Sequence, residues 1–137
     1  MLNLTSQELL SVRLNLEPIA KARPRHTRSG RVYTPASTAT YERAVALLLA
    51  HHRPIEGAVS LDVVFVCKRP KATRTAGRQL KTTKPDVDNL LKSLLDGLNG
   101  CLFHDDAQVV EVRAVKLVAS VDEEPHIDLK IFQMSPC

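Results

Sequence analysis

With 137 residues, 44% of them hydrophobic and 25% charged, the chain has the composition of one ordinary globular domain, and its net charge is only +4. Its longest apolar run, AVALLLA, is far shorter than the roughly 18 residues that a membrane span needs, and the N-terminus lacks the pattern of a secretion signal. Three cysteines without a CxxC pair argue against a disulfide framework or a structural zinc site and fit a reducing cytoplasm. The sequence therefore predicts a single cytoplasmic domain over residues 1–137 with no membrane span.

The basic residues are concentrated in two segments that contain no acid. Residues 21–31 hold five of the 19 Lys and Arg residues, and residues 68–84 hold seven. Two solvated loops would give the same pattern, but two such segments in one small domain favour a polyanion binder, and nucleic acid above all. The residues that we expect to contact DNA are Lys21, Arg23, Arg25, Lys68, Arg69, Lys71 and Lys84.

The first half of the chain contains two periodic segments. Residues 11–17, SVRLNLE, alternate between apolar and polar side chains and predict a half-buried strand. The basic segment that follows contains Ser29-Gly30, a pair typical of the turn of a small ribbon. Ser37 or Thr38 can cap the helix that comes next. The apolar stripe of this helix has i, i+3, i+4, i+7 and i+8 spacing and consists of Tyr41, Ala44, Val45, Leu48 and Leu49.

The second half predicts three strands and a helix. Residues 58–67 pass from alternation to a continuous apolar run, which is typical of a central strand. A helix from about 88 to 99 follows the second basic segment and ends at Gly100. The last strands cover 110–119, where a slip of the alternation between Ala114 and Val115 indicates a β-bulge, and 126–132. The expected buried stripe of the second helix is Leu91, Leu94, Leu95 and Leu98. The order β-α-β-α-β-β predicts an α+β fold, a mixed β-sheet with two packed helices.

Two pairs of aspartates flank the second helix. Asp86 and Asp88 stand at its start, and Asp105 and Asp106 follow it. One interpretation is structural, because aspartate is a favoured N-cap and complements the helix dipole. Under this interpretation the second pair forms a turn between helix and strand.

The other interpretation is a metal centre. A helix over 88–99 is roughly 18 Å long at 1.5 Å per residue. Residues 100–106 span about 3.3 Å each when extended, enough to bring the second pair back alongside the first. Carboxylates that close repel one another unless a cation lies among them, and an all-oxygen ligand set suits Mg²⁺ or Mn²⁺ rather than zinc. Lys92, one turn beyond Asp88, would offset charge on a phosphate, whereas Asp96 is an ordinary i, i+4 partner of Lys92. Together with the basic segments, this arrangement predicts metal-assisted phosphodiester hydrolysis.

The run KPDVDNLLKSLLDGLNG, followed by DDAQVV, resembles the RusA family of Holliday-junction resolvases. The family signature is D-x-D-N-L-x-K followed by D-D-x-Q-V-V, and both parts are present without a mismatch at the functional positions. The early P-x-x-K-x-R-P-R run, from Pro18 to Arg25, and the order of the elements agree with the same family.

This resemblance implies a homodimeric, Mg²⁺- or Mn²⁺-dependent endonuclease that binds four-way DNA junctions and nicks two opposing strands symmetrically. It implies that Asp86, Asp88 and Asp106 are metal-binding catalytic acids and that Lys92 is the catalytic lysine. Asp105 occupies the other acidic position of the family and is expected to support the site.

Phe103 and His104 immediately precede the second acidic pair. We expect Phe103 in the core at the helix–strand corner, with a wedge at the junction centre as the alternative, and His104 as an exposed histidine in a turn. Two other functions remain open. A non-catalytic binder of branched DNA would bind equally well without its aspartates, and a nonspecific or RNA-directed nuclease would use the same site on other substrates.

Overall fold

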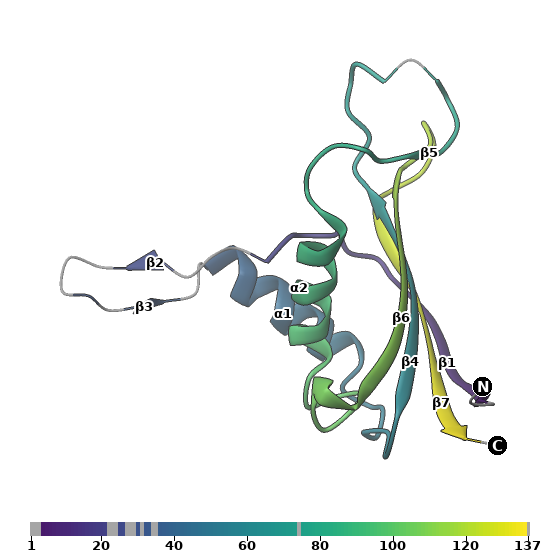
Figure 1. Cartoon of the computed structure of the whole chain (residues 1–137). Coiled ribbons are helices and arrows are strands. Elements are labelled where there is room, and N and C mark those ends of the chain that lie inside the picture. The colour runs from purple at the N-terminus through teal and green to yellow at the C-terminus, as the bar shows by residue number, and fades with distance from the viewer. Residues whose placement is uncertain are drawn as a thin grey trace.

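The computed structural model describes residues 4–21, 25–26, 30, 32–33, 36–73 and 75–136, and it places two helices against one face of a five-stranded sheet (Figure 1). The long elements are β1 (Leu4–Leu14), α1 (Ala36–Leu48), β4 (Val59–Cys67), α2 (Val87–Leu98), β6 (Val109–Val118) and β7 (His126–Pro136). The short elements are β2 (Arg25–His26), β3 (Val32–Tyr33), β5 (Gln79–Leu80) and the 3-10 turn η1 (Asp106–Gln108). The predicted α+β class and the order of the long elements are confirmed.

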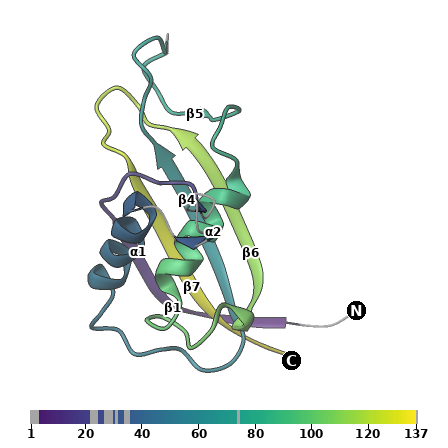
Figure 2. The same cartoon turned by 90° about the vertical axis from the view of Figure 1, so that its left-hand side faces the viewer.

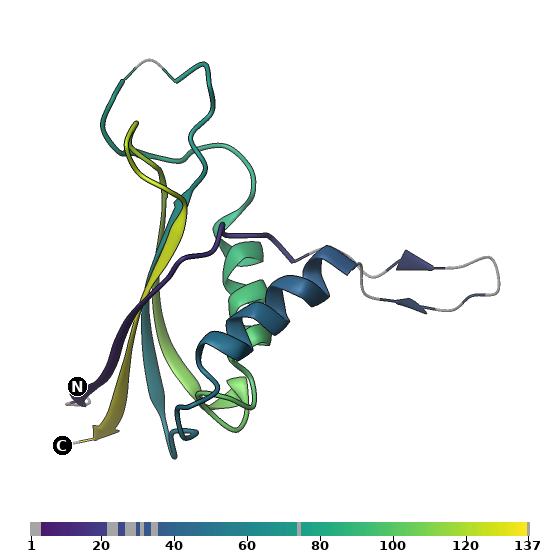
Figure 3. The same ribbon diagram turned by 180° about the vertical axis from the view of Figure 1, so that it is seen from behind.

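The sheet has the strand order β1-β7-β4-β6-β5. The pair β4–β6 is parallel and the other pairs are antiparallel, which makes the sheet mixed. Parallel neighbours need a crossover connection, and the segment that contains α2 provides it. The central position predicted for residues 58–67 is confirmed, since β4 lies third of five strands and Leu61, Val63 and Phe65 are buried under the helices. Figure 3 shows from behind that both helices lie on the same side of the sheet.

Helix α1 covers the sheet with a narrower stripe than its sequence predicts. Tyr41, Val45 and Leu49 are buried, whereas Leu48 is 47% exposed. The buried residues follow one another at i, i+4 and i+8, and Leu48 lies to one side of that line, where no element covers it fully.

Within the described ranges, no helix has the length and apolar character to cross a membrane.

Helix α2 is rotated relative to its predicted orientation. Its buried residues are Leu90, Ser93, Leu94, Gly97 and Leu98. Leu91 and Leu95, both predicted to lie in the buried stripe, are partly buried and border the core. The rotation arises because α2 packs on α1 as well as on the sheet. A Cβ at Gly97 would come within 2.9 Å of the Val45 Cβ, so the helices approach closely at this glycine.

The start of the first strand and the place of the bulge in β6 differ from the predicted ones, whereas the end of α2 and the ribbon near Gly30 agree with them. Strand β1 begins at Leu4 rather than residue 11, because its exposed first half is an edge strand without an apolar face to reveal it. Gly100, with φ of 82°, ends the α2 segment as predicted. The bulge in β6 lies at Val110, where the register with β4 shifts, and not between Ala114 and Val115. The ribbon expected near Gly30 is confirmed by the β2–β3 pairing, while its other turn residue, Ser29, lies outside the described residues.

Candidate metal and DNA site

The first aspartate pair lies at the N-terminal end of α2, on a turn anchored to the sheet. Lys116 of β6 donates from Nζ to the backbone oxygens of Thr83 at 2.8 Å and Pro85 at 2.7 Å. Asp86 occupies the N-cap position, yet its side chain makes no capping hydrogen bond, and Asp88 is exposed in the first turn. Helix capping therefore does not use the Asp86 carboxylate.

The second pair is held by Gln108, which bridges two segments. Its Oε1 accepts from the backbone N–H groups of His104 at 2.7 Å and Asp105 at 3.1 Å. Its Nε2 donates to the backbone oxygens of Ile55 at 2.8 Å and Gly57 at 2.9 Å. One amide thus fastens the turn that carries the aspartates to the chain just before β4. The expected turn is confirmed, with Asp105 at the N-cap of η1.

A Gln108→Leu variant is expected to lose about 1–3 kcal/mol of unfolding free energy, because leucine has a similar shape but makes none of the four hydrogen bonds of the glutamine side chain. Urea unfolding measures this change. Gln133→Leu is the matched control, since Gln133 donates a single bond, to the Glu56 backbone oxygen at 3.1 Å. Equal losses in the two variants would contradict an anchoring role for Gln108.

The two aspartate pairs do not meet within one chain, contrary to the expectation that residues 100–106 return to the start of the helix. Asp105 and Asp106 stay at the C-terminal end of α2, about 18 Å from its start for a twelve-residue helix. The connection after α2 forms a tight turn and does not extend along the helix. Gly100 N donates to Phe103 O at 2.9 Å within this turn, and Ile55 N donates to Leu102 O at 2.7 Å, which joins the turn to the chain before β4. Among the described residues, no group of three or more His, Cys, Asp or Glu side chains is placed to hold a metal ion.

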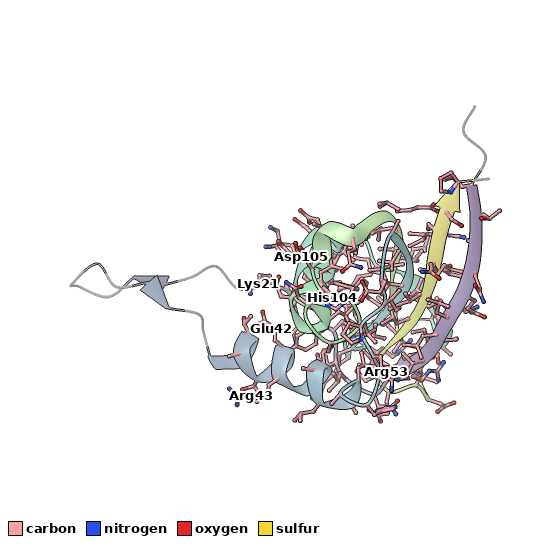
Figure 4. All side chains as sticks on the ribbon, turned by 90° about the horizontal axis from the view of Figure 1, so that it is seen from below. Lys21, Glu42, Arg43, Arg53, His104 and Asp105 are labelled. Atoms are coloured by element: carbon pink, nitrogen blue, oxygen red, sulfur yellow. The ribbon has the colours of Figure 1, made fainter. Side chains whose placement is uncertain are left out.

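Lys92 and Lys21 have different surroundings. Lys92 lies midway along α2 with its side chain 64% exposed, and its Nζ is 4.0 Å from Asp96 Oδ1, which is the expected i, i+4 pair. Lys21 Nζ lies 2.6 Å from Glu42 Oε1 and 2.9 Å from Asp96 Oδ2, beside Glu42 in Figure 4. Burial acts to lower the pKa of Lys21, but the hydrogen bonds to both carboxylates outweigh it and raise that pKa. Lys21, expected to contact DNA, therefore has its charge paired and ties α1 to α2.

The second basic segment divides into residues that shape the loop and residues that face solvent. The Arg69 guanidinium donates to the backbone oxygens of Thr73, Thr75, Ala76 and Ala119, so it organises the loop from within. Lys68, Lys71 and Lys84 are exposed. Of the first segment, Arg23 lies outside the described residues, and Arg25 is described only as backbone of β2.

An ion pair closes the same loop on the turn between β6 and β7. Arg78 Nε donates to Glu123 Oε1 at 2.9 Å, and this hydrogen bond lowers the pKa of Glu123 from its ordinary value of 4.5 to about 2. A depressed carboxylate pKa stabilises the fold above the unfolded pKa and loses that contribution as the pH falls through the folded one.

The stability advantage of the wild type over Glu123→Gln is therefore expected to be largest near neutral pH and to shrink as the pH falls from 4.5 towards about 2. Urea unfolding across that range measures it. The neighbouring Glu124→Gln, an exposed position, is the control and should show a smaller, flatter difference. A constant difference at every pH would contradict the assignment of the ion pair.

The donor chemistry of the four aspartates fits a hard divalent cation, since their carboxylate oxygens are the ligands that Mg²⁺ and Mn²⁺ prefer. Asp86, Asp88 and Asp105 are exposed and Asp106 is partly exposed. The neighbouring His104 is an exposed turn histidine as expected, and its Nε2 lies 2.7 Å from Glu56 Oε1 (labelled beside Asp105 in Figure 4).

Two residues that position the aspartates were not among the predicted site residues. Gln108 lies inside the DDAQVV run, where its place in the motif was the available signal. Lys116 lies near the end of β6 and carries no sequence signal, because its partners, Thr83 and Pro85, are more than 30 residues away in the chain.

Comparison with known proteins identifies one family and one relative. The model of the family "Endodeoxyribonuclease RusA" matches residues 15–132. A protein of Bacillus subtilis (strain 168), described as "Uncharacterized protein YqaN", is 36% identical over 134 residues, which cover 87% of this chain and 92% of that protein. The matched region includes both aspartate pairs, the two helices and the strands β4 to β6.

Proposed function

Because this chain belongs to the RusA family of endodeoxyribonucleases, we propose that it binds four-way DNA junctions as a homodimer and resolves them by paired, symmetric, metal-dependent nicks. The observation that carries the proposal is the exposure of the first two signature aspartates at the start of α2. Asp86 and Asp88 are exposed on an anchored turn, and no described residue makes a hydrogen bond or an ion pair with either carboxylate. Carboxylates held in place and left unpaired are expected where a cation and a phosphate bind.

In this proposal Asp86, Asp88 and Asp106 would hold Mg²⁺ or Mn²⁺, with Asp105 in support. Because the two aspartate pairs lie at opposite ends of α2, they would share a cation only where the two chains of the homodimer meet. The bound cation would supply an activated water and stabilise the leaving oxygen. Lys92 extends from the exposed face of α2 one turn after Asp88, where its ammonium group can offset charge on the scissile phosphate.

The experiment that tests the function compares a labelled synthetic four-way junction with a linear duplex of the same sequence, in Mg²⁺ and in chelator. We expect paired nicks in opposing strands of the junction, in Mg²⁺ only. Equal cutting of the duplex would point instead to a less specific nuclease with the same site. Shifted bands without cleavage would point to a non-catalytic binder of branched DNA.

The exposed lysines of the second basic segment are expected to contribute contacts to the DNA backbone. Each phosphate contact adds about 0.9 to the slope of log affinity against log salt, so replacing Lys68, Lys71 and Lys84 together by Ala should reduce this slope by up to about 3. Junction binding measured by fluorescence anisotropy at several salt concentrations gives the slope. The control removes Arg113 and Lys130, two exposed charges on the helix-free face of the sheet, and should change the slope less.

A further inference from the structure

The segment that joins β5 to α2 carries the chain into the first aspartate pair. It runs from residue 81 to Asp86, and Figure 2 shows it passing beside the end of β6. Within the described part of the chain, residues 82–85 make no hydrogen bond between their own backbone and another backbone group. Side-chain contacts must therefore fix the path of this segment, because the backbone does not fix it by itself.

Lys116 of β6 holds this segment at three points. Its backbone oxygen accepts from Lys81 N at 3.2 Å, where the segment begins. Its Nζ donates to Thr83 O at 2.8 Å and to Pro85 O at 2.7 Å. The oxygen of Pro85 belongs to the planar peptide group that leads directly into Asp86. The last of these bonds therefore sets the direction in which the chain enters the first signature aspartate.

Lys116 is itself firmly placed. It is paired with Phe65 in the parallel ladder between β4 and β6, and Phe65 is 0% exposed beneath the helices. Directly paired residues of neighbouring strands leave the sheet on the same face, so the Lys116 side chain leaves on the helix face, where α2 begins. Its side chain is partly buried. The position of the sheet is thus transmitted to the turn by a side chain that is anchored in a strand.

The positive charge of Lys116 is used on neutral partners. The salt bridges of the described residues all join other groups, so none of their carboxylate oxygens lies within 4.0 Å of the Lys116 Nζ. Both hydrogen bonds of the ammonium group go to backbone oxygens, and a charged donor makes stronger hydrogen bonds than a neutral one. This use of the charge holds a stretch of backbone in place and neutralises no acid.

We propose that Lys116 is a positioning residue of the metal site, whose ammonium group orients Asp86 and the start of α2 so that the Asp86 and Asp88 carboxylates reach one cation. This inference rests on the proposed function. It assigns to Lys116 a control over metal affinity that acts through the backbone, without contact to the metal or to the DNA.

The direction of the effect separates this role from a simple charge effect. Lys116 is a cation beside a site for another cation, so the loss of its charge alone would tighten metal binding by removing a repulsion. The loss of its hydrogen bonds would release the turn and weaken metal binding, because the carboxylates would no longer be held in the binding geometry. A positioning residue therefore gives weaker binding on removal, against the electrostatic trend.

The test measures Mn²⁺ binding to Lys116→Met by calorimetry, with no DNA present. Methionine keeps an unbranched side chain and removes both the charge and the donors. We expect the Mn²⁺ dissociation constant to rise about 10–100-fold, the range for residues that support metal ligands. Single-turnover cleavage of a junction below saturating Mg²⁺ should slow by a similar factor. A loss of folded protein would lower the binding stoichiometry and leave the dissociation constant unchanged, so the two effects are measured separately.

Lys81→Met is the matched control. Lys81 Nζ donates to Thr83 Oγ1 at 3.1 Å, so this variant removes the same charge beside the same turn while both backbone oxygens keep their bonds to Lys116. Its Mn²⁺ affinity should equal or slightly exceed that of the wild type. Lys116→Arg keeps the charge and can donate to two oxygens, so it should recover most of the affinity that Lys116→Met loses.

A Lys116→Met variant that binds Mn²⁺ as tightly as the wild type, or more tightly, would overturn the positioning role. An equal loss of affinity in Lys81→Met would overturn it as well, and so would the absence of recovery in Lys116→Arg. The proposed function fails by a different result. A wild type that binds Mn²⁺ but leaves junctions uncut would overturn the function and leave the positioning role standing, whereas a wild type that binds no Mn²⁺ would overturn both.

Discussion

Asp88→Asn is expected to cleave four-way junctions on the order of 10³-fold more slowly than the wild type, while binding them at least as tightly. A metal ion supplies several kcal/mol of transition-state stabilisation, and one of its ligands loses its charge in this variant. Binding is preserved because the same substitution removes a negative charge beside the phosphate backbone. Single-turnover cleavage and equilibrium binding, measured at one salt concentration, separate the two effects.

The matched control is Asp122→Asn, which makes the same chemical change at an exposed turn between β6 and β7. It should cleave at close to the wild-type rate. If Asp88→Asn also retains that rate, the first aspartate pair has no part in catalysis, and helix-dipole stabilisation remains its function.

Phe103→Ala is expected to lower the free energy of unfolding by about 3–5 kcal/mol, the range for truncating a buried aromatic residue. Phe103 is 0% exposed, in the core between the end of α2 and the chain before β4. Its backbone oxygen also closes the turn with Gly100 N at 2.9 Å. The expected core position is therefore confirmed, and a wedge into the junction is not available to this side chain in the folded chain.

Chemical denaturation measures the effect, with Phe132→Ala as the control. Phe132 is the neighbour of buried Ile131 on β7 and is only partly buried, so its truncation should cost less. A Phe103→Ala variant as stable as the wild type that fails only in junction binding would restore the wedge interpretation.

The elements of this fold could be predicted where their pattern is local. The alternation of Ile127, Leu129 and Ile131 predicted β7, and all three are buried. The continuous apolar run of β4 is also a local pattern, and it predicted the central strand that the sheet contains. Predictions failed where a second element decides burial. Leu91 and Leu95 lie on a regular apolar stripe, but α1 packs on α2 at Gly97, and both leucines only border the core.

For the site, the residue types were predictable and their arrangement was not. The spacing of Asp86, Asp88 and Lys92 on one helix follows from the sequence, as do the turn at Asp105 and the family signature that contains it. The sequence also showed which segments are basic. Only the structure distinguishes Arg69, which binds four backbone oxygens of its own fold, from Lys68 and Lys71, which face solvent.

The sequence by itself determined which residues carry carboxylates, which segments are basic, the order of the long elements and the family. Only the tertiary structure decided that the two aspartate pairs lie at opposite ends of α2. The physical reason is that contacts between distant residues govern the path of the connection after the helix. Ile55 fastens it beside β4 through a backbone hydrogen bond to Leu102, and Gln108 does so through its side-chain amide. No local pattern encodes these contacts, and an extended return to Asp86 would break them.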